Sequence, residues 1–252
     1  MARLRLDRVL ANSGVGSRTE VRVLINRGRV RVDGNVVRDA ASQCDPALVT
    51  LDGEPLDHPG GVLVALHKPV GFASSHDERE APLVDALLPP SWAQRTPRPE
   101  WAGRLDRDTS GLLIISDDHV LLHRLTSPRH HVDKEYRATV DRPPAGDAAE
   151  RFTAGIVLAG EEDRPCLPAL LRLDGERTVS VTLHEGRYHQ VRRMLAAVGS
   201  HVETLHRVRF GPWTLDHLDL AEGQWCDVAR PVASPAAPPV APPTTAAPVL
   251  LA

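Results

Sequence analysis

The chain has 252 residues, 42% of them hydrophobic and 25% charged, and its formal net charge is −3. This composition is typical of a globular protein, and the length suits two small domains or one domain with appendages. No apolar run reaches the roughly 20 residues that a membrane span needs, and the first residues lack a signal-peptide pattern, so we expect a cytoplasmic protein with no membrane partner.

The first sixty residues predict a compact helix–helix–hairpin unit. Residues 6–10 have helical spacing, and residues 17–20, Ser-Arg-Thr-Glu, form a capping-box sequence that opens a second helix. That helix should end near Gly28. Residues 29–32 then alternate as a strand does, and Asp33-Gly34 is a turn signal.

This unit is rich in arginine. Residues 1–38 hold nine arginines and three acidic residues, and Arg18 and Arg22 share one face of the second helix. Such a patch can bind phosphates, although a basic face exposed to solvent explains it equally well.

The remainder divides into two regions. Residues 61–230 mix strands with helices in no regular alternation, which favours an α+β domain. We expect strands at residues 62–66, 112–116, 136–140 and 178–183. Residues 231–252 contain seven prolines, seven alanines and no charge, which favours disorder.

Metal sites and disulfides are not expected. The cysteines, Cys44, Cys166 and Cys226, lie far apart and lack a CxxC spacing. Neighbouring histidines on an extended segment, such as His130 and His131, point to opposite sides and make a poor chelate.

The segment 103–111, GRLDRDTSG, precedes an apolar strand, so we expect its polar residues to form a turn at a sheet edge. A carboxylate there, above all that of Asp106, can face a cleft. Local chemistry alone favours a simpler role, in which the Asp, Thr and Ser side chains bond to their own backbone.

The segment 185–199, EGRYHQVRRMLAAVG, reads as an amphipathic helix that ends at Gly199. Its polar residues, including His189 and Arg192, could meet a phosphate or a carboxylate, or could lie on an exposed face. The only two lysines, Lys68 and Lys134, and the only two tyrosines, Tyr136 and Tyr188, all lie within such motif segments.

Taken in order, HKPVG, GRLDRDTSGLLIISDD, KEY and EGRYHQVRRM resemble the RsuA-type pseudouridine synthases. The first sixty residues resemble the S4 RNA-binding domain that precedes their catalytic domain. The resemblance spans about residues 3–230. It implies an S4-like domain at 1–60, a mixed, mainly antiparallel-sheet catalytic domain at 61–230, and a tail at 231–252.

Within that family, LTSPRHH, KEY and EGRYHQVRRMLAAVGSHVETLHRVRFG look closest to the branch that modifies one uridine of 16S ribosomal RNA. Relatives that act on large-subunit RNA tend to have an Asn-containing sequence where this chain has Tyr188-His189-Gln190. Arg192 departs from the branch, whose members often have lysine there, although the positive charge is kept.

The resemblance also implies roles for individual residues. Asp106 would be the nucleophile, Tyr136 would stack on the extruded base near its C5 proton, and Arg192 would pair with Asp106. The expected substrate-binding residues are Arg104, Lys68, Tyr188, His189 and Gln190. The expected RNA-binding residues are Arg18, Arg22, Arg29 and Arg31.

The chemistry requires no cofactor and no metal, and we expect a monomer whose partner is small-subunit ribosomal RNA, in the form of an assembly intermediate. Two alternatives stay open. One is the same reaction on a 23S uridine, and the other is a non-catalytic ribosome-assembly protein that keeps this scaffold.

Overall fold

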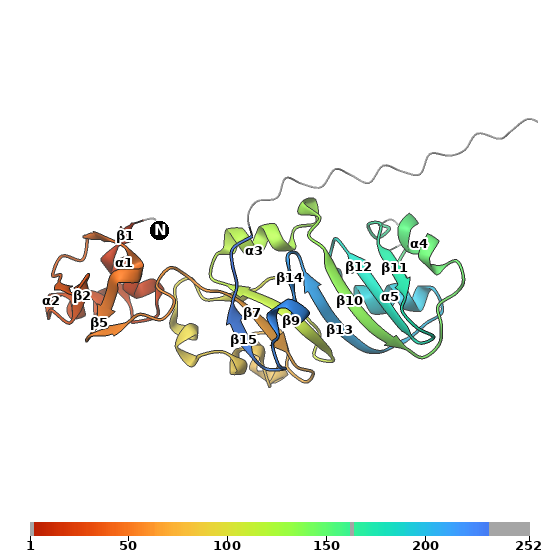
Figure 1. Cartoon of the computed structure of the whole chain (residues 1–252), viewed down its shortest axis with the longest axis horizontal. Helices are drawn as coiled ribbons and strands as arrows, with labels where there is room; N and C mark the ends of the chain where they lie inside the picture. Colours follow the sequence, from red (N-terminus) through yellow and green to blue (C-terminus); the bar gives the residue numbers. More distant parts are fainter. Residues whose placement is uncertain (1–2, 162–163, 232–252) are drawn as a thin grey trace, which may run out of the picture.

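The computed structural model describes residues 3–161 and 164–231, which form a small N-terminal unit followed by a large, strongly twisted sheet with helices (Figure 1). The α+β class predicted from the sequence is confirmed. Residues 232–252, most of the segment for which we expect disorder, lie outside the described residues.

The N-terminal unit has the predicted helix–helix–hairpin order. Its helices and strands are β1 (Leu4–Arg5), α1 (Leu6–Asn12), α2 (Arg18–Asn26), β2 (Val30–Val32), β3 (Asn35–Val36), β4 (Gln43–Cys44), η1 (Pro46–Leu48), β5 (Val49–Leu51) and β6 (Glu54–Pro55). The Ser17–Glu20 capping box is formed in both directions. Val21 and Ile25 of α2 pack with Leu6, Val9 and Leu10 of α1 in a core of their own.

The large unit is built on one nine-stranded sheet. Its strands are β7 (Leu63–Lys68), β8 (Glu100–Trp101), β9 (Thr109–Ser116), β10 (Lys134–Val140), β11 (Leu170–Leu173), β12 (Thr178–Leu183), β13 (Val202–Phe210), β14 (Trp213–Thr214) and β15 (Trp225–Asp227). The main order is β11-β12-β10-β13-β9-β7-β15. Among the described strand pairs only β13 and β9 run parallel, so the sheet is mixed and mainly antiparallel.

Helices cover both faces of this sheet. They are α3 (His119–Thr126), α4 (Ala148–Ala154), α5 (Gln190–Ala197) and α6 (Leu215–Leu218), with 3-10 turns η2 (Glu78–Glu80), η3 (Val84–Leu87), η4 (Pro90–Gln94) and η5 (Pro128–His130). Side chains of α3 pack with one apolar cluster and those of α4 and α5 with another. Strand β9 lies between β13 and β7, and all eight of its residues are buried.

Two irregularities bring strands together near the centre. Gly111 has a φ of +116°, and a Cβ atom there would lie 2.3 Å from the carbonyl oxygen of Arg207 on β13, so only glycine permits this approach. A bulge between Glu135 and Tyr136 shifts the β10–β13 register, so Tyr136 lies opposite Arg207.

The expectation that residues 105–112 form a turn is partly wrong. Strand β9 begins at Thr109 rather than near Leu112, because residues 109–111 pair with residues 205–207 of β13. A partner almost one hundred residues away leaves no local pattern in the sequence.

A buried arginine binds residues 57–58, which connect the two units, to the large unit. The side chain of Arg95 is 1% exposed, donates to the carbonyls of Asp57 and His58 at 3.0 and 2.8 Å, and pairs with Asp117 at 3.2 Å. The His58 ring also meets the Trp92 ring edge-on, with centroids 5.2 Å apart. These contacts hold the polypeptide between the two units against the sheet.

Candidate active site

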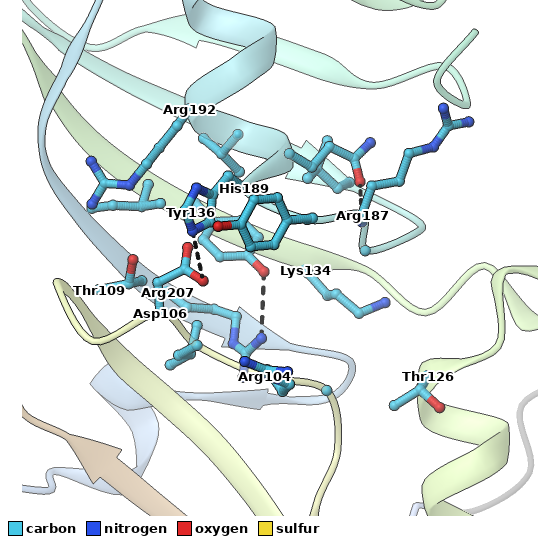
Figure 2. A pocket seen from close by; sticks show the side chains of 18 residues that line it. Arg104, Asp106, Thr109, Thr126, Lys134, Tyr136, Arg187, His189, Arg192 and Arg207 are labelled. Carbon is cyan, nitrogen blue, oxygen red and sulfur yellow. Dashed lines mark hydrogen bonds and ion pairs between the residues drawn. The ribbon is translucent and has the colours of Figure 1, made fainter. Parts of the chain in front are cut away.

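A cavity of about 420 Å³ opens where the loop before β9, the strands β10 and β13, and the start of α5 meet. Its walls bring together Asp106, Tyr136, His189, Arg192 and Arg207 (Figure 2). Three of the four sequence motifs therefore meet at one place, although they span nearly ninety residues of the chain.

Asp106 lies on the loop between β8 and β9 with its side chain 31% exposed. The Thr109 amide donates to the Asp106 carbonyl at 3.0 Å, which closes the turn. The carboxylate is thus carried on a short loop that is fixed at the start of a fully buried strand.

Lys68 supports this loop from inside the protein. It is fully buried, and its ammonium donates to the carbonyls of Pro69, Asp106 and Thr109 at 3.0, 3.2 and 2.7 Å. Burial lowers the pKa of Lys68 to about 8, against the partly compensating charges of Asp108 and Asp106. The expectation that Lys68 binds substrate is therefore wrong: its donors are occupied and it does not line the cavity.

His189, rather than an arginine, meets the Asp106 carboxylate. It sits at the N-cap of α5 with a φ of +50°, and its Nε2 lies 3.5 Å from Oδ1 of Asp106 (Figure 2). Tyr188, whose residue is 75% exposed, stacks on the His189 ring at a centroid distance of 3.9 Å.

Arg192 does not pair with Asp106, which corrects the sequence-based expectation. Its guanidinium forms an ion pair with Asp108 at 2.8 Å and donates to the carbonyls of Asp108 and Val202. The reason is geometric. His189 reaches Asp106 from the N-terminal end of α5. Arg192 lies almost one helical turn further along the helix and meets Asp108 on the same loop. Arg192 still lines the cavity.

Tyr136 is 9% exposed and forms part of the cavity wall. Beside it lies Arg207, which the sequence analysis did not single out. Arg207 is 1% exposed, its Nε donates to the Leu112 carbonyl at 2.7 Å, and its Nη1 lies 3.4 Å from the Tyr136 hydroxyl. Arg207 lies in a quoted motif, but only the bulge at Val208 of β13 places it opposite Tyr136.

The other expected substrate-binding residues differ in whether their side chains are already hydrogen-bonded within the protein. Arg104 is exposed at the cavity and has no hydrogen-bond or ion-pair partner among the residues that the structure describes. Gln190 is buried, and its amide donates to Glu185 at 2.8 Å and accepts from the Arg187 backbone at 2.9 Å. Gln190 therefore shapes the turn before α5 as well as lining the cavity.

The four expected RNA-binding arginines fall into two pairs. Arg18 and Arg22 line an open groove between the N-terminal unit and residues 96–97 of the large unit, and neither forms an ion pair within the described chain. By contrast, Arg29 pairs with Asp52, and Arg31 donates to the Gly34 carbonyl at 3.0 Å.

Sequence comparison assigns both units. A model of the RNA pseudouridylate synthases matches residues 62–197, and an S4 domain model matches residues 4–49. The chain belongs to the RNA pseudouridylate synthase family. Its cavity motifs lie within the first match except for Arg207, and the family resemblance expected from the sequence is confirmed.

Known relatives cover nearly the whole of this synthase. A protein named ribosomal small subunit pseudouridine synthase A from Escherichia coli K12 is 43% identical over 88% of this chain and 95% of its own. An RNA pseudouridine synthase from Bacillus subtilis is 37% identical, over 88% and 93%. A crystal structure of a pseudouridylate synthase superposes with a TM-score of 0.62 at 33% identity, over 90% and 96% of the two chains.

No helix among the described residues is long and apolar enough to cross a membrane. The same part of the chain contains no group of three or more His, Cys, Asp or Glu side chains arranged to hold a metal ion.

Proposed function

We propose that this synthase converts one uridine of small-subunit, 16S ribosomal RNA to pseudouridine, with Asp106 as its nucleophile. The observation that carries the proposal is the position of Asp106. Its carboxylate lies at the cavity, on a loop held by Lys68, across from Tyr136. The relatives named as small-subunit synthases, at 40–43% identity, support the choice of RNA.

The reaction breaks the N1–C1′ bond, turns the base, and joins C5 to C1′. It involves no redox change, because the C5 proton is lost and N1 gains one. The cavity offers two groups that this reaction requires: a carboxylate to act as nucleophile and an aromatic ring to stack on the base. We assign acceptance of the C5 proton to the hydroxyl of Tyr136, which lines the same cavity.

A base must leave its stack to enter this cavity, which costs a few kcal/mol. The S4 unit offsets that cost by holding phosphates at a second place. Arg18 and Arg22, whose charges are unpaired within the described chain, would make these contacts. We accordingly assign RNA positioning to residues 1–60 and catalysis to residues 61–230, in a monomer that works where ribosomal RNA is made.

Partly assembled small subunits should be the preferred substrate. Base extraction is easiest where RNA is unpaired yet held in shape, and only a folded target presents the two contact sites at fixed spacing. The rival substrate is a uridine of 23S RNA. The rival function is RNA binding without catalysis.

One experiment separates these possibilities. Purified wild-type protein and Asp106→Asn are each given 16S transcript, small-subunit assembly intermediates, mature subunits and 23S RNA, and pseudouridine is mapped in each. We expect conversion at one 16S position by the wild type alone. Conversion confined to 23S RNA would refute the choice of substrate. No conversion of any RNA would leave only a binding function.

A further inference from the structure

Arg207 carries a buried positive charge that the protein itself does not neutralise. Its Nε is bound to the Leu112 carbonyl and its Nη1 faces the Tyr136 hydroxyl, but its Nη2 is buried without a hydrogen-bond partner. No carboxylate of the described residues forms an ion pair with it. An unpaired buried charge costs several kcal/mol, so proteins keep one where a ligand will use it.

The backbone is built to hold Arg207 at this cavity. Without the bulge before Tyr136, Val208 would lie opposite the tyrosine, because a shift of one residue turns every side chain to the other face. Gly111 then allows β9 to approach the Arg207 backbone more closely than any other residue would. Two separate features of the sheet thus place this guanidinium beside Tyr136 (Figure 2).

Two other residues that line the cavity have unused hydrogen-bonding capacity. The Thr109 hydroxyl is buried and unpaired in the described structure. Lys134, 4% exposed, lies on the same face of β10 as Tyr136 and donates only to the Val132 carbonyl, at 3.2 Å. Burial, together with the charge of Arg207, lowers the pKa of Lys134 to about 8. The residues that line this part of the cavity therefore carry hydrogen-bond donors and positive charge. They suit a ligand whose acceptor atoms gain negative charge during the reaction.

We propose that Arg207, which lines the cavity, is a catalytic residue whose guanidinium donates to a carbonyl oxygen of the extruded uracil and stabilises the negative charge that the base acquires during the reaction. This rests on the proposed function, since it needs the uracil to stack at Tyr136.

The charge arises by either route open to Asp106. If its carboxylate bonds to C1′, the N1–C1′ bond breaks with its electron pair on uracil, and N1, O2 and O4 share the charge. If it adds to C6, the C5–C6 π pair moves onto O4. The charge disappears when C5 bonds to C1′, the C5 proton leaves and N1 is protonated. A cation that contacts a uracil carbonyl therefore favours the transition state over bound uridine.

The test compares Arg207→Met, Arg207→Gln and Arg207→Lys under single turnover on two RNAs. One is 16S transcript containing uridine. The other is the same transcript containing 5-fluorouridine, whose fluorine withdraws electrons and stabilises the base anion. Because fluorine cannot leave C5 as the proton does, the event measured on both RNAs is breakage of the N1–C1′ bond, not formation of pseudouridine. Loss of one such donor costs about 100-fold or more in rate, so we expect that loss for the Met variant on uridine. We expect a smaller loss on 5-fluorouridine, and Lys should recover most of the rate.

Arg209→Met is the matched control. Arg209 lies two residues along β13, pairs with Asp133 and does not line the cavity. RNA binding and melting temperature are measured for every variant. If Arg207→Met does not fold, Gln against Lys gives the same comparison.

Equal losses on the two RNAs would overturn the proposal, because a residue that only positions Tyr136 is indifferent to the electronics of the base. Retained activity in folded Arg207→Met would overturn it as well. If the wild type converts no uridine, the proposed function fails instead, so the two failures are distinguishable.

Discussion

Arg192 and Asp108 form an ion pair at 2.8 Å, and this pair connects α5 to the loop that carries Asp106. The Asp108 side chain is 65% exposed, so the pair should be weak, worth about 0–1 kcal/mol. We therefore expect Asp108→Asn to slow turnover only slightly.

Substitution of Arg192 itself should matter more, because its guanidinium also lines the cavity. Arg192→Ala should lower turnover well below that of Arg192→Lys, since lysine keeps the charge. The measurement is a double-mutant cycle with Asp108→Asn, read as kcat and KM. If the Lys and Ala variants turned over at the same rate, a role for the positive charge would be excluded.

Asp106→Asn should abolish turnover while RNA binding stays within a few-fold of wild type. The amide has almost the shape of the carboxylate but cannot act as an anionic nucleophile. Pseudouridine formation and RNA affinity are measured side by side, with Asp108→Asn as the control on the same loop. Substantial activity in Asp106→Asn would remove this residue from its proposed role.

Tyr136→Phe should bind RNA normally and turn over slowly, because it keeps the ring that we propose stacks on the base and loses the hydroxyl that we propose accepts the C5 proton. The chain has one other tyrosine, so Tyr188→Phe provides the comparison. Tyr188 is 75% exposed and should tolerate the change. A Tyr136→Phe enzyme as fast as wild type would show that its hydroxyl takes no part.

Lys68→Met should lower the free energy of unfolding at pH 7 by about 1–3 kcal/mol, because three buried carbonyls lose a donor. It should also slow turnover, since one of these carbonyls belongs to Asp106. Urea denaturation and activity assays at pH 7 measure the two effects. Unchanged stability would mean that the loop that carries Asp106 keeps its conformation without Lys68.

The pH dependence of stability offers an independent check on Lys68. Its pKa in the folded protein is lowered to about 8 from 10.5, so between these values the unfolded chain binds more protons and stability rises with pH. Below pH 8 the cost of burying the ammonium is present in full. Wild type should therefore gain stability relative to Lys68→Met from pH 8 to 10, and parallel curves would contradict the burial of a charged amine.

Arg18→Ala with Arg22→Ala should weaken RNA binding and reduce the slope of log affinity against log salt by about 1–2, because each lost phosphate contact removes about 0.7–0.9. Arg29→Ala is the control, since its charge is already paired with Asp52. RNA binding is titrated from low to high salt. An unchanged slope in the double variant would mean that α2 presents only a solvated face.

Local patterns predicted much of this molecule. The Ser17–Glu20 capping box, the Asp33-Gly34 turn and the strand at 178–183 each follow from neighbouring residues, and the structure contains all three. A polar turn beside an apolar strand allowed Asp106 to face a cleft, but local chemistry favoured a simpler role, and the family resemblance pointed to the cleft.

Residues whose surroundings come from distant strands were harder to interpret. The sequence suggested that Lys68 binds a ligand, but in the structure its strand pairs with β9 and the side chain is buried. The partner of Arg192 depends on where α5 begins, and the position of Arg207 depends on a bulge in β13 that the sequence pattern does not reveal. In each case the deciding contact is between residues 38 or more positions apart, and amphipathic spacing carries no information on it.

The parallel pairing of β9 with β13 also has a consequence for how the protein is made. Asp106 and Tyr136 leave the ribosome long before residues 202–210, yet β9 has no neighbour on that side until β13 arrives. A nascent chain of 200 residues would therefore hold Asp106 beside an open sheet edge, which is prone to pair with other chains. When β13 pairs with β9, it covers the open edge and completes the cavity in one event. The active site therefore forms only when the edge can no longer pair with other chains.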